Sequence, residues 1–270
     1  MAESDAIDRA RAPVTVASME RDLRALGVHA GDVLVVHASL SALGWVVGGP
    51  AAVVDALLQA VGADGTVTMP AHSGDWSHPS GWANPPVPQE WWQTIAQERP
   101  AFDPYATPMR EMGSVAENLL MRRSTLRSRH PLYSHMANGH HAEAIVRNHP
   151  FEDGFGDGSP LGRLYDLDAK VLLLGVGHGN NTSLHLAESR ADWVGKVTVE
   201  QSSTVMVDGR ATVVAWNSYE PDGDDFGPLG SALDHAGLVR FGKVGEAECR
   251  LASQRELVDA AVPWIEAHRR

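Results

Sequence analysis

The chain has 270 residues, of which 43% are hydrophobic and 21% charged, and this balance excludes a disordered or collagen-like protein. Its 34 acidic and 22 basic residues give a formal net charge of −12, which disfavours nucleic acid or anionic lipid as a partner and favours a cationic one. The single cysteine, Cys249, excludes an intramolecular disulfide, and no apolar run approaches the length needed to cross a bilayer. We therefore expect a cytoplasmic protein with one two-lobed α/β domain over residues 1–270, flexible at residues 1–13.

The first half of the chain predicts a strand-helix-strand unit followed by long loops. A glycine-rich loop at 44–49 joins the first strand to a helix that Pro50 opens. Residues 71–110 are rich in Pro, Trp, His and Gly and show no sustained periodicity. The expected elements are a helix at 16–26, a strand at 33–36, a helix at 51–61, a strand at 66–69, and one short helix near 90–97.

The second half predicts further helices, one buried strand and an antiparallel hairpin. Residues 170–175 form the clearest buried strand, and a helix follows it at about 182–190. The other expected elements are helices at 114–121, 141–147 and 159–167, a hairpin at 197–216 that turns at 208–209, and helices at 226–235 and 254–267. Together the elements predict a central mixed sheet flanked by helices, with a separate hairpin region.

The segment from Gly175 to Glu188 contains several polar side chains at helical spacing directly after this strand. On a helix that begins near 181, Asn181 and His185 are four residues apart and His185 and Glu188 are three apart, so they share a face. Thr182 lies on the same face. Because polar groups above a buried strand cost free energy unless they are hydrogen-bonded or used, this face is a candidate site.

His185 is the candidate base on this face. An imidazole exchanges protons near neutral pH, and a carboxylate bonded to its other ring nitrogen would fix the tautomer and support the imidazolium. The same pattern also allows a hydrogen-bonded core histidine beside a helix-capping Asn181.

Three separated segments resemble the aminoglycoside 3-N-acetyltransferase family. They are GVGHGNNTSLHLAE at 175–188, VVHASLSALGWVVGG at 35–49 and RHPLYSHMANG at 129–139, and the resemblance extends over about residues 16–236. It implies an enzyme that transfers an acetyl group from acetyl-CoA directly to an amine of an aminoglycoside, with the 3-amino group of 2-deoxystreptamine as the expected position. The alternative is an N-acyltransferase of the same fold that acts on a non-antibiotic amine.

The resemblance implies that His185 is the general base. It also places an acidic loop after the hairpin, which in this chain is 219–225. From that loop we expect Glu220 to orient His185, with Asp222 and Glu188 as the alternative carboxylates.

The glycine-rich loop resembles the segment of the family that binds CoA. Glycines let the backbone approach a ligand, and a helix N-terminus favours anionic oxygen, although an ordinary strand-to-helix turn has the same composition. The CoA contacts that the resemblance implies are His37, Ser39, Leu40, Ser41, Gly44, Trp45, Val46, Thr107, Ser114 and Thr182.

Carboxylates are expected to bind the polycationic substrate. Asp75 resembles an acidic substrate-contact position of the family. Together with it we expect contacts from Glu188, Asp222, Asp224 and Asp225. The expected partner is thus a small molecule, with no nucleic acid or membrane partner, and the protein is expected to be a monomer or homodimer.

Thirteen histidines suggest a metal site, but their spacing does not support one. There is no HExxH motif, and adjacent His140 and His141 on a helix would point about 100° apart, so we expect no metal. Cys249 has no nearby base in the sequence, which disfavours a covalent acyl carrier. A metal-dependent hydrolase and a drug-sequestering protein without chemistry are therefore the weaker alternatives.

Overall fold

A computed structural model of the protein describes residue 7 and residues 12–269, and it has a central seven-stranded mixed sheet. The strand order is β3-β4-β2-β1-β5-β9-β8, and β1 is parallel to both of its neighbours, β2 and β5. The other pairings in this sheet are antiparallel. The strands span Val33–Ala38 (β1), Thr66–Pro70 (β2), Leu126–Arg127 (β3), His135–Gly139 (β4), Lys170–Leu174 (β5), Arg240–Val244 (β8) and Ala247–Ser253 (β9).

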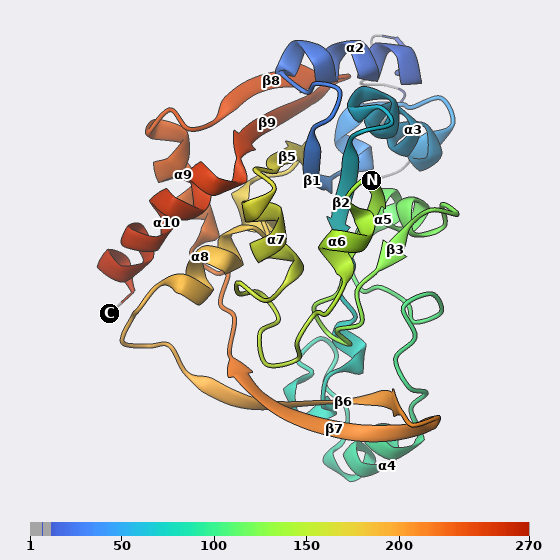
Figure 1. The fold of residues 1–270 in the computed structure, drawn as a ribbon, viewed down its shortest axis with the longest axis vertical. Coiled ribbons are helices and arrows are strands. Elements are labelled where there is room, and N and C mark those ends of the chain that lie inside the picture. Colours follow the sequence, from blue (N-terminus) through green and yellow to red (C-terminus); the bar gives the residue numbers. More distant parts are fainter. Residues whose placement is uncertain (1–6, 8–11, 270) are drawn as a thin grey trace.

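Helices cover both faces of the sheet, as Figure 1 shows. Alternate residues of β1 serve two cores: Leu34 and Val36 pack in one, and Val33 and Val35 in the other. A strand buried on both faces needs an apolar residue at nearly every position, which explains its unbroken apolar run. The first core contains α2 (Val16–Leu26), α3 (Gly49–Val61) and α5 (Gly113–Leu120), and the second α6 (Ala142–Val146), α7 (Pro160–Asp166), α8 (Leu184–Arg190), α9 (Phe226–His235) and α10 (Gln254–His268).

A two-stranded hairpin lies apart from the main sheet. In Figure 1, β6 (Thr198–Val207), β7 (Arg210–Tyr219) and α4 (Trp92–Glu98) lie at the end of the molecule opposite α2 and α3. Its turn has positive φ at Asp208 and Gly209, as a tight two-residue hairpin turn requires. The long loop 71–110 docks on the hairpin, because the Phe102 amide donates to the Thr204 carbonyl at 2.8 Å. The expected α/β fold with a separate hairpin is therefore confirmed.

The structure also differs from the predicted elements. Four strands of the sheet, β3, β4, β8 and β9, are absent from the prediction because they are short or mix polar and apolar residues. Helix α8 begins at Leu184, whereas the expected helix begins at 182, and Asn181 ends a short 3-10 turn at 178–180. The expectation for residues 1–13 lies almost entirely outside the described residues. In the part of the chain that is described, no helix has the length and apolar character needed to span a membrane.

A cluster of buried histidines and aromatic rings joins the hairpin to the sheet. His130 packs 4.7 Å from His149 and edge-on to Trp216 of β7, measured between ring centroids. Tyr133 accepts a 2.8 Å hydrogen bond from Gln201 of β6 and packs 4.4 Å from the Phe155 ring. His130 accepts hydrogen bonds from the Leu132 and Tyr133 backbone amides, so it has a packed structural role.

Burial keeps these histidines neutral. It lowers the pKa of His37 to about 3, of His130 to about 3 and of His135 to about 4, and it places those of His72 and His149 well below the ordinary value. The unfolded chain would bind protons at these residues from about pH 6.5 downwards, whereas the folded chain would not.

We predict that this difference makes the fold acid-sensitive. The stabilising contribution is fully present above pH 6.5 and is lost as pH falls towards 4, by about 1.4 kcal/mol per pH unit for each histidine. Urea unfolding between pH 7.5 and 5.5 should show the loss. The Nε2 atom of His135 has no partner among the described residues. His135→Gln should reduce by about one the number of protons that the chain binds when it unfolds at acidic pH, whereas His235→Gln on an exposed helix face should not. A free energy of unfolding that does not change over this pH range would contradict the prediction.

Candidate active site

A cavity of about 820 Å³ opens at the carboxyl ends of the three parallel strands. Ligands collect at this edge of open α/β sheets, where neighbouring connections leave in different directions. The walls come from four parts of the chain, 36–49, 69–72, 111–116 and 176–185, together with Gly223 and Phe226. The volume is within the range of small-molecule and cofactor sites.

Nearly all of the expected CoA-contacting residues line this cavity. The lining set includes His37, Ser39, Leu40, Ser41, Gly44, Trp45, Val46, Ser114 and Thr182. Thr107 is the exception, since it does not line the cavity, and its expected contact with CoA stays a prediction. Its hydroxyl accepts a hydrogen bond from the Asp103 amide, and its carbonyl accepts one from the buried Arg127, so it stabilises a loop elsewhere.

Two helix N-termini contribute to the cavity wall. Helix α3 begins at Gly49, and both Gly49 and the preceding Gly48 have positive φ. Glycine is the residue that adopts this backbone conformation most readily. Helix α5 begins at Gly113, and the lining continues through Ser114. Exposed amides and the helix dipole make such ends favourable for anionic oxygen. No glycine-rich motif in the sequence marks the N-terminus of α5 as part of the site. Only the fold brings it beside α3.

His37 is held in a neutral, accepting state at the end of β1. Its Nε2 accepts a hydrogen bond of 3.4 Å from the Thr182 amide, in the segment that follows β5. Because burial lowers the pKa of His37 to about 3, the ring carries no charge at neutral pH. His37 thus connects two walls of the cavity.

His185 forms a hydrogen-bonded pair with Glu188. Its Nδ1 donates to Glu188 Oε2 at 2.7 Å, and both residues lie on α8, three positions apart. The carboxylate fixes the tautomer with the proton on Nδ1, so Nε2 keeps a free electron pair. Among the described residues, none bonds to Nε2. His185 also lines the cavity, which presents this nitrogen to a ligand as a proton acceptor.

Two aromatic rings hold the imidazole in place. Phe155 stacks on it with ring centroids 4.5 Å apart and an angle of 19°, and Phe226 packs against it at 4.7 Å. The backbone carbonyl of His185 accepts a 3.1 Å hydrogen bond from the Tyr219 hydroxyl at the end of β7. The ring can therefore change little in orientation during proton exchange. Phe155 has no sequence signal, because it lies in an irregular loop.

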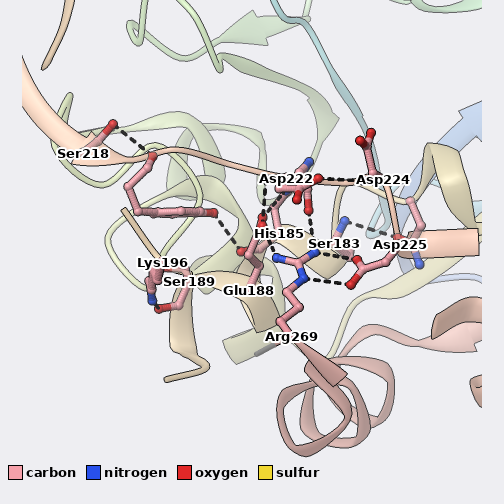
Figure 2. Close-up of polar contacts among 12 residues, drawn as sticks. Ser183, His185, Glu188, Ser189, Lys196, Ser218, Asp222, Asp224, Asp225 and Arg269 are labelled. Carbon is pink, nitrogen blue, oxygen red and sulfur yellow. Dashed lines mark hydrogen bonds and ion pairs between the residues drawn. The ribbon is translucent and has the colours of Figure 1, made fainter. Parts of the chain in front are cut away.

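Glu188 is completely buried and has three donors. Besides His185, the Asp222 amide donates to Oε1 at 2.7 Å and Arg269 Nη1 donates to Oε1 at 2.5 Å. Figure 2 shows Arg269 between Glu188 and Asp225. A carboxylate surrounded in this way is not exposed to the cavity, so the structure gives no support to the expected substrate contact of Glu188.

The structure places Glu188, and not Glu220, against His185. Glu220 is exposed, and its backbone amide donates to the Val197 carbonyl at the base of the hairpin. The geometry thus favours Glu188, one of the alternatives, as the orienting carboxylate, and Glu220 stays a prediction. Asp222 contacts the pair only through its backbone amide.

The acidic loop has both paired and open carboxylates. Both side-chain oxygens of Asp225 accept hydrogen bonds from Arg269, at 2.5 and 2.8 Å, so this carboxylate is already paired within the protein. Asp222 and Asp224 are exposed on either side of Gly223, which lines the cavity. Of the expected substrate-contacting residues in this loop, these two remain available to a cation.

Asp75 lines a second cavity, of about 640 Å³, that adjoins the first. The two cavities share His72, Glu111 and Met112 as walls. Asp75 forms an ion pair with Arg110, whose Nη2 also donates to the Asn84 carbonyl at 2.6 Å. The Asp75 side chain is 48% exposed, so a cationic group can approach it beside the guanidinium. The described residues include no group of three or more His, Cys, Asp or Glu side chains suited to a metal ion.

Comparison with known proteins agrees with the three segments that suggested a family. The family described as aminoglycoside 3-N-acetyltransferase matches residues 35–266. The chain is 40% identical to the prophage-derived aminoglycoside N(3')-acetyltransferase-like protein YokD of Bacillus subtilis, over 94% of this chain and 93% of YokD. It is 38% identical to aminoglycoside N(3)-acetyltransferase VIII of Streptomyces fradiae, over 99% of this chain and 97% of that enzyme.

Solved structures show the same fold. The crystal structure of YokD from Bacillus subtilis has a TM-score of 0.96 at 38% identity and covers 98% of both chains. The AAC-IIIb complex with CoASH has a TM-score of 0.85 at 30% identity, over 96% of this chain and 98% of that one. The AAC-VIa complex with sisomicin has a TM-score of 0.86 at 31% identity, over 96% and 99%. The chain is an enzyme that belongs to the aminoglycoside 3-N-acetyltransferase family.

Proposed function

We propose that this protein transfers the acetyl group of acetyl-CoA to the 3-amino group of an aminoglycoside, with His185 as the general base. The observation that carries the proposal is the His185–Glu188 pair at the wall of a cavity that two helix N-termini also line. Family membership supports it, as do the CoASH complex of AAC-IIIb and the sisomicin complex of AAC-VIa.

The larger cavity fits acetyl-CoA in chemistry and in size. The N-termini of α3 and α5 would bind the pyrophosphate oxygens through backbone amides, and the hydroxyls of Ser39 and Ser114 add donors. The apolar walls formed by Leu40 and Val46 suit the pantetheine arm. In this orientation the thioester would lie toward His185.

The second cavity suits the remote part of a polycationic substrate. Asp75 would bind one ammonium group there, while Asp222 and Asp224 would attract others at the rim of the first cavity. The reacting amine would then lie near His185, where Phe155 and Phe226 provide apolar surroundings.

The reaction follows from these positions. The amine nitrogen attacks the thioester carbon, its proton passes to Nε2 of His185, and the C–N bond forms as the C–S bond breaks and CoA leaves. Glu188 stabilises the imidazolium through Nδ1–H, as a carboxylate does in other histidine-dependent sites. Binding both substrates in joined cavities also replaces a bimolecular encounter by an oriented one.

The first prediction tests the activity itself. Mixed with acetyl-CoA, the protein should release thiol with sisomicin but not with simple mono-amines, and NMR should locate the acetyl group on the 3-amino nitrogen. His185→Gln should lower kcat by about a thousandfold while the KM for acetyl-CoA changes little, because only proton transfer is lost. His235→Gln is the control. Acetylation of mono-amines at equal rates would instead favour a metabolic amine as the substrate.

A second prediction separates the two candidate carboxylates. Glu188→Gln should lower kcat by about a hundredfold or more, since the amide cannot balance the imidazolium charge. Glu220→Gln should retain activity close to that of the unmodified protein, because this side chain is exposed and Glu188, not Glu220, bonds to His185. Steady-state kinetics of the two variants decide between them, and the reverse result would show that Glu220 is the functional partner.

A third prediction concerns Asp75. Asp75→Asn should raise the KM for sisomicin about tenfold, which corresponds to about 1.4 kcal/mol, with little change in kcat, because the carboxylate binds a group away from the reaction. Asp55→Asn is a matched control, since Asp55 pairs with Arg122 and is similarly exposed but lines neither cavity. Equal KM values for the two variants would exclude Asp75 from the substrate site.

A further inference from the structure

Arg269, the residue that follows α10, is bonded to the active-site carboxylate. Its side chain is only 8% exposed. Nη1 donates to Glu188 Oε1 at 2.5 Å, Nη2 to Asp225 Oδ1 and to the Asp222 carbonyl at 2.5 Å each, and Nε to Asp225 Oδ2 at 2.8 Å. The guanidinium also lies over the Trp193 ring, 4.8 Å from its centroid. All three nitrogen atoms of the guanidinium thus donate hydrogen bonds (Figure 2).

The charges around Glu188 require such a cation. A fully buried carboxylate is costly unless it is paired, and of its three donors Arg269 alone carries a permanent charge. Burial by itself would lower the pKa of Arg269, but hydrogen bonds and charges from Asp225 and Glu188 raise it above its usual value. Two carboxylates and one guanidinium leave one negative charge, which a proton on His185 would balance.

Among the described residues, no other nearby cation fills this role. Lys196 lies close enough to be affected by the Glu188 charge, but its Nζ donates to the carbonyls of Ser189 and Ala191 instead. Arg190, on the same helix as Glu188, pairs with the exposed Asp157.

Arg269 also connects three segments that form the site. It links the end of α10 to α8 through Glu188 and to the loop 222–225 through Asp222 and Asp225. That loop places Gly223 in the cavity wall and leads into Phe226, which packs on the His185 ring. Loss of the guanidinium would therefore release the carboxylate and one support of the imidazole together.

We propose that Arg269 is a positioning residue for acetyl transfer, which holds the Glu188 carboxylate aligned with Nδ1 of His185. The inference rests on the proposed role of His185 as the base. Arg269 would not contact either substrate. The other titratable or charged groups that interact with the pair are His37, His72 and His135 from the sheet side, Tyr133 and Tyr219 from the loop and hairpin side, and Lys196. Asp225 shares the Arg269 guanidinium.

The test compares Arg269→Gln with Arg190→Gln, which breaks another arginine–aspartate pair that involves α8. With acetyl-CoA and sisomicin at pH 7.5, Arg269→Gln should lower kcat about a hundredfold and leave both KM values within about twofold. Removing the cation favours the protonated form of His185, so the acidic limb of the kcat profile should move to higher pH and the deficit should shrink near pH 9. Arg190→Gln should match the unmodified protein in all three respects.

A double variant separates this inference from the proposed function. Arg269→Gln combined with His185→Gln should be no slower than His185→Gln alone, since a positioning residue acts only through the base. If His185→Gln keeps most of its activity, the base assignment fails whatever Arg269 does. If His185→Gln is inactive but Arg269→Gln matches Arg190→Gln in kcat and pH profile, the role of Arg269 alone is overturned.

Arg269→Lys keeps the test valid if Arg269→Gln does not fold. The ammonium keeps the charge but cannot reproduce the planar fork that spans Glu188 and Asp225. We expect kcat to fall about tenfold with the acidic limb at the pH of the unmodified protein. A folded Arg269→Lys protein with an unchanged kcat would overturn the inference.

Discussion

The buried charge of Glu188 is the constraint that organises the site. A carboxylate without solvent contact is stable only with good donors, and removing one partner of such a pair typically costs about 3–5 kcal/mol. The donors come from α8 itself, from the loop after β7 and from the residue after α10, which are far apart in the sequence. Folding must therefore bring α8, the acidic loop and the end of α10 together before the charge is satisfied. The hydrogen bonds to Glu188 therefore both stabilise this region and fix the geometry of His185.

The neighbouring histidines are buried without a carboxylate partner, and burial keeps them neutral. His37, His130 and His135 are enclosed, their pKa values are lowered to about 3 or 4, and each serves as a neutral hydrogen-bonding or packing group. His185 differs because its Nδ1 bonds to Glu188 while the ring still reaches the cavity. One type of side chain thus has two functions, and the presence of a buried counter-charge decides between them. A low-dielectric region of neutral histidines also strengthens the His185–Glu188 interaction.

The sequence predicts the parts of the site that follow from local spacing. The three-residue interval between His185 and Glu188 predicts a shared helix face, and the apolar run before His37 predicts the strand that ends at the cavity. Glu220 was preferred to Glu188 by resemblance, but the direction in which a hairpin leaves its sheet is not encoded in spacing. Arg269 has no local signal, because its role depends on a contact with a helix 81 positions earlier. The short strands β3 and β4 were missed since pairing with β2, and not their own pattern, makes them strands.

The distribution of acidic residues resolves a difficulty in the proposed chemistry. Carboxylates bind ammonium groups but raise the pKa of the amine, which opposes nucleophilic attack. The overall charge of −12 therefore says little about the reaction, because Glu188 and Asp225 are paired with Arg269 inside the protein and do not face the substrate. The half-exposed carboxylate Asp75 lies in the second cavity, while the His185 ring packs against Phe155 and Phe226, the latter of which lines the first cavity. Under the proposed function, distant ammonium groups would be bound by charge, and the reacting amine would meet a base in surroundings that favour its neutral form.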